Sequence, residues 1–590
     1  MKFSFTGRFQ GYNRESFQKD FISGLIVGII AIPLGMAFAI ASGVKPEYGL
    51  YTTIVAGIII SLLGGSTFQI GGPTGAFIPI LFAIVMQYGY ENLLIAGFMA
   101  GVLLVIMGLF KLGKVMKFIP RPVIIGFTSG IAVTIFTGQI ASFLGLHQLE
   151  KHENFMANMK ELGIHMASTN SYSVATALIC LVFIILTPRL FPKVPGSLVG
   201  LLISTVVASL LYPDKVATIG STYGAIPNSI PGIRMPSLSI EHMLYLIKPA
   251  LVIAMLGGIE SLLSAIVADG MTGTRHNSNR ELIGQGIANM ITPLFGGIPA
   301  TGAIARTATN IKSGAASPLS GVIHGIVVFL VLFLFAPYAS NIPLASMAPI
   351  LMVVAWNMSE RKEFAHILKT RTAESFVLVS TFLLTVFTDL TTAVEVGLVL
   401  SGIIFVKHMS VLLSTTKVLP DPSDNNKKVS AHMIHEQHNC PQISIYTVEG
   451  ALFFGVANRF EKSIMDEIHN KPKVLLLKMS HVPYMDATGE AHLASIAKHL
   501  KKHGGVVIIS EIQDQPRQLL KKTGLDEIIG QDHFFDQTGN AISFALTKLN
   551  HAQCLGCEHD AFRECQQLSR PRAIPVQPQL VHSSSLQVSD

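Results

Sequence analysis

One carboxylate stands inside an apolar stretch, where ionisable side chains are costly. Glu260 lies within Leu251–Ile266, far from either end of that run. Ionisable groups at such depth in a membrane helix are usually functional, and they are protonated, paired or bound to an ion. Ser264 follows about one helical turn later on the same face, so the two side chains could hold Na⁺ or relay a proton. The alternative is a structural Glu260 that is hydrogen-bonded to a neighbouring helix.

Two short segments containing Pro and Gly resemble one another. Gly72–Ala76 reads Gly-Pro-Thr-Gly-Ala, Pro299–Ala303 reads Pro-Ala-Thr-Gly-Ala, and a Gly-Gly pair lies just upstream of each Thr-Gly-Ala. Interrupted segments at corresponding places in two halves predict an inverted repeat with a binding site near the membrane midplane. The alternative is that Gly and Pro are simply common in membrane helices.

Helices that begin at these segments would direct free N–H groups and positive dipole ends into the membrane interior. Two such starts facing each other form an anion site without a fixed cation. Thr74 and Thr301 add hydroxyl donors, and Gly75 and Gly302 permit close approach. Arg306, about a turn further on, adds positive potential to that site; its alternative role is a cytoplasmic anchor at the membrane edge.

Two other motifs carry less chemistry. Gly108–Val115 nearly spells a phosphate-binding loop, but Val115 replaces the hydroxyl that ligates Mg²⁺, which excludes ATP-driven transport by this chain. A C-terminal cluster favours reduced surface thiols, and we expect no metal and no cofactor. The alternative is zinc, for which the candidate ligands are Cys554, Cys557, His559 and Cys565. His324 and Asn289 lie in apolar spans and are predicted to pack between helices.

Composition indicates the elements that must position these residues. Of 590 residues, 50% are hydrophobic and only 13% are charged, against roughly 25% charged in soluble proteins. An ordinary soluble enzyme, a disordered protein and a nucleic-acid binder are thereby excluded. A membrane helix needs roughly 20 apolar residues, and eleven clear segments plus three interrupted ones predict fourteen spans. The net charge of +7 fits basic cytoplasmic loops, which place both termini inside.

The chain divides by composition into five parts. Residues 1–20 form a cytoplasmic N-terminal segment, 21–413 a membrane domain and 414–440 a polar linker. Apolar strands alternate with amphipathic helices over 441–550, which predicts a small soluble α/β domain. The remaining part, 551–590, combines the Cys and His cluster with a polar tail of disordered character.

Several separated stretches resemble the SulP family, the sulfate permease relatives of the animal solute carrier 26 anion transporters. The stretches that carry the resemblance are Ile32–Ala39, Gly43–Tyr51, Gln69–Ala76 and Gly257–Asp269, with Met485–Gly489 resembling the loop of a STAS domain. The resemblance covers about residues 15–550. It implies a seven-plus-seven inverted repeat with core and gate subdomains, elevator-like alternating access and a homodimer.

The resemblance also implies roles for particular residues. Phe38 matches the aromatic residue of the first broken helix. Glu260 matches the coupling-ion carboxylate, and Ser264 keeps one hydroxyl of the family's sodium site, where aliphatic Ile304 replaces another. That departure weakens a Na⁺ site and favours H⁺ coupling. The anion-facing helix starts match Thr74, Gly75 and Ala76 in the first half and Ala303, Ile304 and Ala305 in the second.

Further stretches, Gly270–Thr274, Glu281–Gly286 and Met352–Glu360, are similar to the bacterial C4-dicarboxylate (succinate) branch of the family. Branch resemblance is weaker evidence for a substrate than family resemblance is for transport. In the STAS loop, Ala487 stands where anti-sigma-factor antagonists carry a phosphorylatable Ser after the loop Asp, so a phospho-switch at that position is excluded. The loop residues are Asp486, Ala487, Thr488 and Gly489, and the domain is expected to stabilise a dimer or bind a cytosolic protein.

These observations predict a non-enzymatic secondary transporter of the plasma or inner membrane that moves a small anion together with protons. Burial and a nearby anion both favour the protonated carboxyl of Glu260, and protonation removes the repulsion of the incoming anion. A C4-dicarboxylate is the first substrate expected, with sulfate or bicarbonate as the alternative within the family. A passive anion channel and an anion sensor that signals through the STAS domain are the alternative classes.

Overall fold

In the computed structural model two compact units divide the chain at Ser401 and Gly402, and each is considered by itself. The division falls inside the last predicted membrane segment and not at its end. The structure describes residues 6–9, 12–114, 119–150, 152, 154–191, 194–229, 232–233, 239–388, 390–420, 429–430, 434, 438–468, 472–559 and 561–569. Much of the expected linker, 421–428, and the tail beyond 569 lie outside the described residues.

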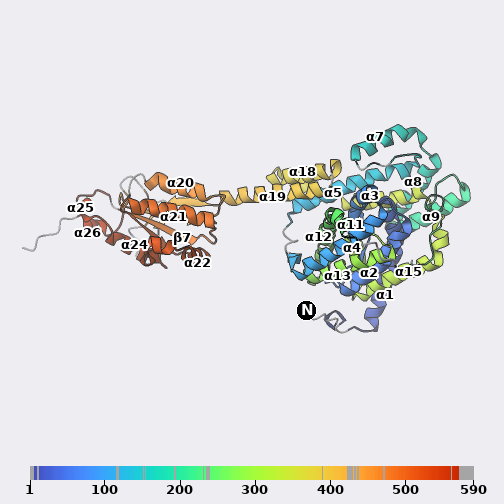
Figure 1. Cartoon of the computed structure of the whole chain (residues 1–590), viewed down its shortest axis with the longest axis horizontal. Coiled ribbons are helices and arrows are strands. Elements are labelled where there is room, and N and C mark those ends of the chain that lie inside the picture. The colour runs from blue at the N-terminus through green and yellow to red at the C-terminus, as the bar shows by residue number, and fades with distance from the viewer. Residues whose placement is uncertain are drawn as a thin grey trace, which may run out of the picture. The chain divides into compact units, whose positions relative to one another are not determined.

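The first unit is helical (Figure 1). Each of the fourteen predicted segments coincides with a helix or an interrupted helix among the described residues. Eight helical stretches in that part of the chain are long and apolar enough to cross a membrane. The helices are α1 (Arg14–Ala41), α2 (Pro46–Leu63), α3 (Ile78–Tyr88), α4 (Tyr90–Leu109), α5 (Arg121–Gly138), α6 (Ile140–Leu144), α7 (Phe155–His165), α8 (Ser171–Leu190), α9 (Gly196–Leu211), α10 (Ile219–Tyr223), α11 (Ile240–Tyr245), α12 (Ile247–Thr272), α13 (Ser278–Ile291), α14 (Ile304–Lys312), α15 (Leu319–Ala339), α16 (Leu344–Met358), α17 (Arg361–Thr370), α18 (Ala373–Phe387) and α19 (Leu390–Val411).

Two groups of helices form in this unit. In one group α1 packs on α2 and α15, while α4 packs on α12 and α13; in the other α5 packs on α16 and α18, and α8 on α9. Figure 1 shows α1, α2 and α15 side by side. Small residues permit the closest crossings, since a Cβ added at Gly101 of α4 would lie 2.6 Å from the carbonyl oxygen of Gly286 in α13. The two groups correspond to the expected core and gate.

Two helices of the core group begin inside the unit rather than at its edge. Strand β1 (Gly71–Gly72) pairs antiparallel with β2 (Thr301–Gly302), with Gly72 opposite Thr301. A short 3₁₀ helix, η2 (Gly75–Phe77), leads from β1 into α3, and α14 follows β2 directly. The pairing satisfies backbone groups that could not be left open to lipid. The two segments that resemble each other in sequence therefore meet at one crossing.

The second unit contains a five-stranded sheet in the order β3-β6-β7-β8-β9, antiparallel between β3 and β6 and parallel elsewhere. Alternate side chains of β6 contribute to the hydrophobic cores on the two faces of the sheet. Tyr446 and Val448 pack with Phe460 on one face, whereas Ile443 and Ile445 pack with Ile542 on the other. The strands are β3 (Ser414–Lys417), β4 (Leu419–Pro420), β5 (Val429–Ser430), β6 (Ile443–Glu449), β7 (Val474–His481), β8 (Val506–Ser510) and β9 (Phe534–Phe535). The helices are α20 (Ala457–Ile468), α21 (Ala487–Lys502), α22 (Asp514–Thr523), α23 (Leu525–Ile529), α24 (Thr538–Thr547), α25 (His551–Cys554) and α26 (Cys565–Leu568).

The sequence mispredicts two features of this unit. The apolar run 450–455, one of the segments that the alternating pattern predicts as a strand, forms a turn in which Leu452 makes a single bridge to Met485. Strand β3 falls inside the segment expected as a linker and becomes the edge of the sheet. Short polar edge strands carry little hydrophobic pattern, so their pairing depends on the neighbouring strand.

Candidate functional site

The two interrupted helices leave unbonded N–H groups at their starts. In the first, the earliest bond runs from the Phe77 N–H to the Thr74 carbonyl (3.3 Å), which leaves the amides of Gly75 and Ala76 without an intrahelical partner. In the second, the earliest bond runs from the Thr307 N–H to the Ala303 carbonyl (2.8 Å). The amides of Ile304, Ala305 and Arg306 therefore stand at the start of α14.

Ala303 differs from the sequence expectation, in which its amide meets the anion. Its N–H donates to the carbonyl of Ile70 at 2.8 Å and extends the pairing of β1 with β2. The side chain of Ala303 is buried, whereas Ile304 and Ala305 are exposed within the unit. The helix start that a ligand can approach is therefore formed by Ile304 and Ala305.

Glu260 of α12 reaches the start of the first interrupted helix. Its Oε2 accepts a hydrogen bond of 2.9 Å from the Thr74 hydroxyl, and Thr74 is the residue that precedes η2. Glu260 is partly buried and Thr74 is buried. The sequence left two roles open for Glu260, a structural hydrogen bond to a neighbouring helix and a function in transport. The two roles are compatible here, because the hydrogen-bond partner belongs to the candidate anion site.

Ser264 does not join Glu260, which corrects the sequence expectation of a shared ion site. Its hydroxyl donates to the Thr307 hydroxyl at 3.2 Å, and Thr307 in turn accepts from the Ile70 N–H at 3.0 Å. Both side chains of α12 lie one turn apart, but they face different neighbours. Ser264 therefore helps to attach α14 to the β1 segment and does not add a ligand beside Glu260.

Arg306 is fully inside the core group and is not a membrane-edge anchor. Its side chain is only 3% exposed, and its Nη2 donates to the carbonyl of Pro73. The guanidinium lies across Gly72, where an added Cβ would stand 2.7 Å from Nη1. Nη1 has no hydrogen-bond partner among the described residues. This nitrogen therefore has a donor that is free for an acceptor such as an anion, since Arg presents donors and cannot be deprotonated.

Gate side chains cover the first helix start. A Cβ added at Gly75 would lie 3.5 Å from Met358 Sδ, 3.6 Å from Ile135 and 3.7 Å from Phe38. Phe38, which the sequence assigns to the anion site, thus lies beside Gly75. Ile135 and Met358 come from α5 and α16, so both helix groups contribute to this site.

A cavity of about 720 Å³ opens next to this contact. Ile135 and Ile78 line it, and the ends of α1, α3 and α5 furnish its walls at Ala41, Tyr88 and Gly138. Further lining residues come from α7 and α12, on the gate and core sides respectively. The cavity therefore lies between the helix groups, next to Ile78 and Ile135.

The sequence reading missed several hydroxyls that hold the crossing together. Ser261 Oγ and Thr301 Oγ1 lie 2.8 Å apart, and Ser261 also accepts from the Gly302 N–H at 3.1 Å. Thr301 is thereby used within the crossing rather than offered to an anion. The only sequence signal for Ser261 is a small polar residue directly after Glu260.

Two residues set aside in the sequence behave differently from one another. Asn289 donates to the Ala300 carbonyl and accepts from the Ala300 N–H, each at 2.8 Å, which is the packing role expected for it. His324 is fully buried, and neither ring nitrogen has a hydrogen-bond partner among the described residues. An added Cβ at Gly57 would lie 3.1 Å from His324 Nδ1. His324 thus packs tightly against α2.

The STAS loop is built as a helix cap. Asp486 is the N-cap of α21, and its side chain accepts from the N–H groups of Gly489 (2.8 Å) and Phe454 (2.9 Å). Ala487 and Thr488 are exposed on the first turn, whereas Gly489 is buried against Leu452. Asp486 is thereby committed to fixing two loops, and the exposed surface at this point consists of the two residues after it.

Two helices start in the interior and are paired through short strands, and a carboxyl and a guanidinium lie at their starts. This arrangement is typical of a membrane transporter with a central binding site. The chain belongs to the sulfate permease family: residues 17–381 match that family, and residues 433–541 match the STAS domain. The fold is that of the solute carrier 26 transporters. Murine solute carrier 26 member A9, solved as an anion transporter in an inward-facing state, superposes with a TM-score of 0.82 at 19% identity, over 91% of this chain and 92% of that one.

Two relatives extend over nearly the whole chain. "Putative sulfate transporter YvdB" of Bacillus subtilis is 59% identical over 90% of this chain and 98% of its own length. "Bicarbonate transporter BicA" of a Picosynechococcus species is 33% identical over 86% of this chain and 91% of its own length. The protein is therefore an anion transporter of this family. The names of these two relatives refer to sulfate and bicarbonate, and they do not support the dicarboxylate branch suggested by the sequence.

Proposed function

We propose that the protein is a secondary active symporter that moves a small oxyanion, sulfate first, together with a proton held at Glu260. The observation that carries the proposal is the hydrogen bond between Glu260 and Thr74 at a helix start, beside the backbone that Arg306 contacts. A titratable carboxyl in direct contact with the anion-binding element couples the charge of one to the occupancy of the other.

The charge balance of the site favours a dianion when Glu260 is protonated. Each helix start carries about half a positive charge, and Arg306 adds a full one. With Glu260 ionised, its charge cancels that of Arg306 and leaves about one positive charge from the helix starts. With Glu260 protonated the site holds about two, which matches sulfate. Proton binding therefore prepares the site for a doubly charged anion.

The surroundings of Glu260 favour a proton over Na⁺ as the coupling ion. Na⁺ requires several oxygen ligands around one point, but Ser264 is bonded to Thr307, and Ile304 supplies an aliphatic side chain. Thr74 is the hydroxyl that contacts Glu260. Bicarbonate is the second candidate, favoured by the relative of that name. As a single negative charge it would load while Glu260 is ionised, without a proton.

We further propose an elevator-like cycle in which the core group carries the loaded site past α5 and α16. The contacts of Gly75 with Ile135 and Met358 are the ones that such a movement would break and remake. The family favours a homodimer in the plasma or inner membrane, and the basic loops favour cytoplasmic positions for both termini. The STAS domain would then be the surface for a second copy or a cytosolic protein.

The experiment is uptake of labelled sulfate into proteoliposomes under an inward proton gradient, an inward sodium gradient or neither. Accumulation above the external concentration under the proton gradient supports the proposal, and it excludes a passive channel and a pure sensor. Unlabelled succinate and bicarbonate are added as competitors. Accumulation driven by sodium would reject proton coupling. The same uptake is then measured with labelled succinate and with labelled bicarbonate, and accumulation of either one without any of sulfate would keep the site and replace the substrate.

A further inference from the structure

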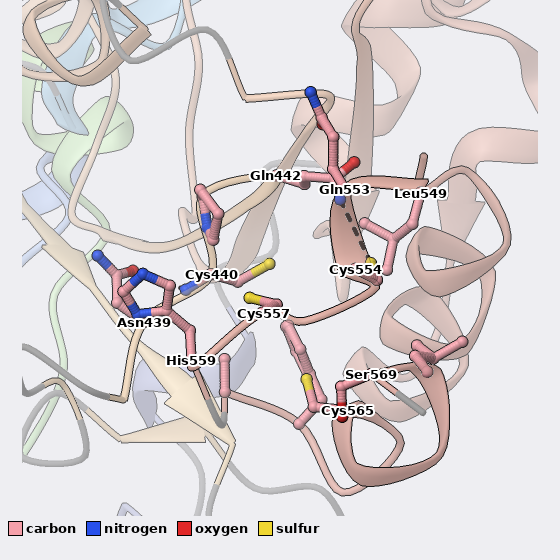
Figure 2. Close-up of a pocket in the computed structure, with 14 residues that line it drawn as sticks. Asn439, Cys440, Gln442, Leu549, Gln553, Cys554, Cys557, His559, Cys565 and Ser569 are labelled. Carbon is pink, nitrogen blue, oxygen red and sulfur yellow. Dashed lines mark hydrogen bonds between the residues drawn. The ribbon is translucent and has the colours of Figure 1, made fainter. Parts of the chain in front are cut away.

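Four of the five cysteines meet in the second unit. Cys554 and Cys557 form a Cys-x-x-Cys pair after α24, Cys565 begins α26, and Cys440 precedes β6 more than one hundred residues earlier. All four line one small pocket together with His559. In Figure 2 the side chains of Cys440 and Cys557 point into the same space. The sequence grouped only the C-terminal residues, and the fold adds Cys440 to them.

The interior of this pocket suits a single ion. Its volume is about 30 Å³, and on this measure a cavity needs about 10–15 Å³ to hold one water-sized occupant. His559 Nδ1 is buried there without a hydrogen-bond partner among the described residues. A thiol that coordinates a cation loses its proton.

The helices around the cysteines are short. Helices α25 and α26 have four residues each, and helices of that length are unstable by themselves. Phe562 and Ala561 pack on one face of the sheet. Gln442, two residues after Cys440, donates to Cys554 Sγ at 3.4 Å and accepts from the Asn550 N–H at 2.9 Å. Gln442 therefore joins the segment before β6 to the segment after α24. Hydrogen bonds outside the ligand shell position metal ligands in the same way.

We infer that this pocket is a zinc site in which Cys440, Cys554, Cys557 and Cys565 bind one Zn²⁺ as thiolates. The two-residue spacing of Cys554 and Cys557 is that of structural zinc sites, and four sulfur ligands in tetrahedral geometry select Zn²⁺ among the common divalent ions. Binding releases the four thiol protons to solvent. The metal would attach residues 551–569 to the start of β6.

The described side chains do not already surround a metal, since no group of three or more His, Cys, Asp or Glu in that part of the chain is arranged to hold one. The inference therefore includes a rotation of the cysteine side chains to other staggered positions on binding. His559 lines the same pocket, but four thiolates complete a tetrahedral set, so His559 is assigned no place among the ligands. Reduced thiols are expected for a cytoplasmic domain, and the structure has no disulfide between Cys440, Cys554 and Cys557.

The test uses the full-length protein in detergent, purified without chelator, with metal content measured by mass spectrometry. We expect one zinc per chain in the wild type and in His559→Ala, and loss of zinc in Cys440→Ser and in Cys557→Ser. The matched control is Cys180→Ser, because Cys180 lies in α8 with its Sγ on the Ser346 carbonyl, and it should retain the metal.

A second measurement is independent of whether the variants fold. Wild-type protein is stripped with a chelator and loaded with Co²⁺, which gives thiolate charge-transfer and tetrahedral ligand-field absorption when bound to sulfur. Such bands, abolished by added zinc, are the expected result. Wild-type protein with neither zinc nor cobalt bands would overturn the inference. So would iron with iron–sulfur absorption, a disulfide between Cys440 and Cys557, or equal zinc in the wild type and a folded Cys440→Ser.

Discussion

The central prediction concerns the loss of proton coupling in Glu260→Gln. Gln keeps the shape of the side chain and an oxygen that accepts from the Thr74 hydroxyl, so the start of η2 stays in place. What the substitution removes is the single carboxyl found at this helix start. If that carboxyl carries the proton, sulfate transport in the variant becomes independent of the proton gradient while binding of the anion is preserved.

The magnitude follows from one carboxyl carrying one proton. A difference of one pH unit is worth about 1.4 kcal/mol per proton. With the membrane potential held at zero, one proton per sulfate therefore permits about a tenfold accumulation for each pH unit. In Glu260→Gln the internal and external sulfate concentrations should become equal, and exchange of labelled for unlabelled sulfate should continue.

The assay is the steady-state ratio of internal to external labelled sulfate in proteoliposomes clamped with potassium and valinomycin, at several imposed pH differences. Glu91→Gln is the control, because Glu91 is exposed in the first turn of α4 and away from the site. A ratio rising about a hundredfold per pH unit would show a second proton carrier. If Glu260→Gln still accumulates sulfate and His324→Gln does not, His324 and not Glu260 carries the proton. That result would refute the reasoning.

Three further predictions test the contacts around the site and the second unit. Gly72→Ala places a methyl group 2.7 Å from Arg306 Nη1 at a φ of +148°. The resulting strain of about 1–3 kcal/mol should raise the sulfate concentration for half-maximal initial uptake roughly tenfold or more. An unchanged concentration would contradict the role of Arg306. Gly101→Val overfills the contact with Gly286 and should cost about 1–3 kcal/mol, seen as a lower midpoint of thermal unfolding in detergent, whereas Gly138→Ala, with open space around it, should leave the midpoint unchanged. Asp486→Ala removes two hydrogen bonds from backbone amides and should lower the free energy of unfolding of the second unit by about 1–2 kcal/mol. The measurement is denaturant unfolding that is followed by the loss of β-sheet signal, and equal stability would reject the capping role.

Much of the candidate site can be predicted from local sequence because its features are local. Glu260 is conspicuous since a carboxyl in an apolar run is costly wherever the run packs. The interrupted helices are marked by Gly and Pro, which act on the backbone at their own positions. Hydroxyl partners are different, because Ser264 can turn to either neighbour of α12 and only the packed helices decide that it meets Thr307.

The same division separates what sequence and tertiary structure each determine in this protein. The sequence alone determines a helical membrane domain, two interior helix starts, a carboxyl at the depth of those starts and a soluble α/β domain, because hydropathy, periodicity and turn residues act over a few positions. The tertiary structure decides that Arg306 turns inward to the Pro73 carbonyl, that the Ala303 amide is used by Ile70, and that Cys440 joins the C-terminal cysteines. Each of these contacts joins residues far apart in the chain, so its partner is fixed by the packing of whole elements and not by any local pattern.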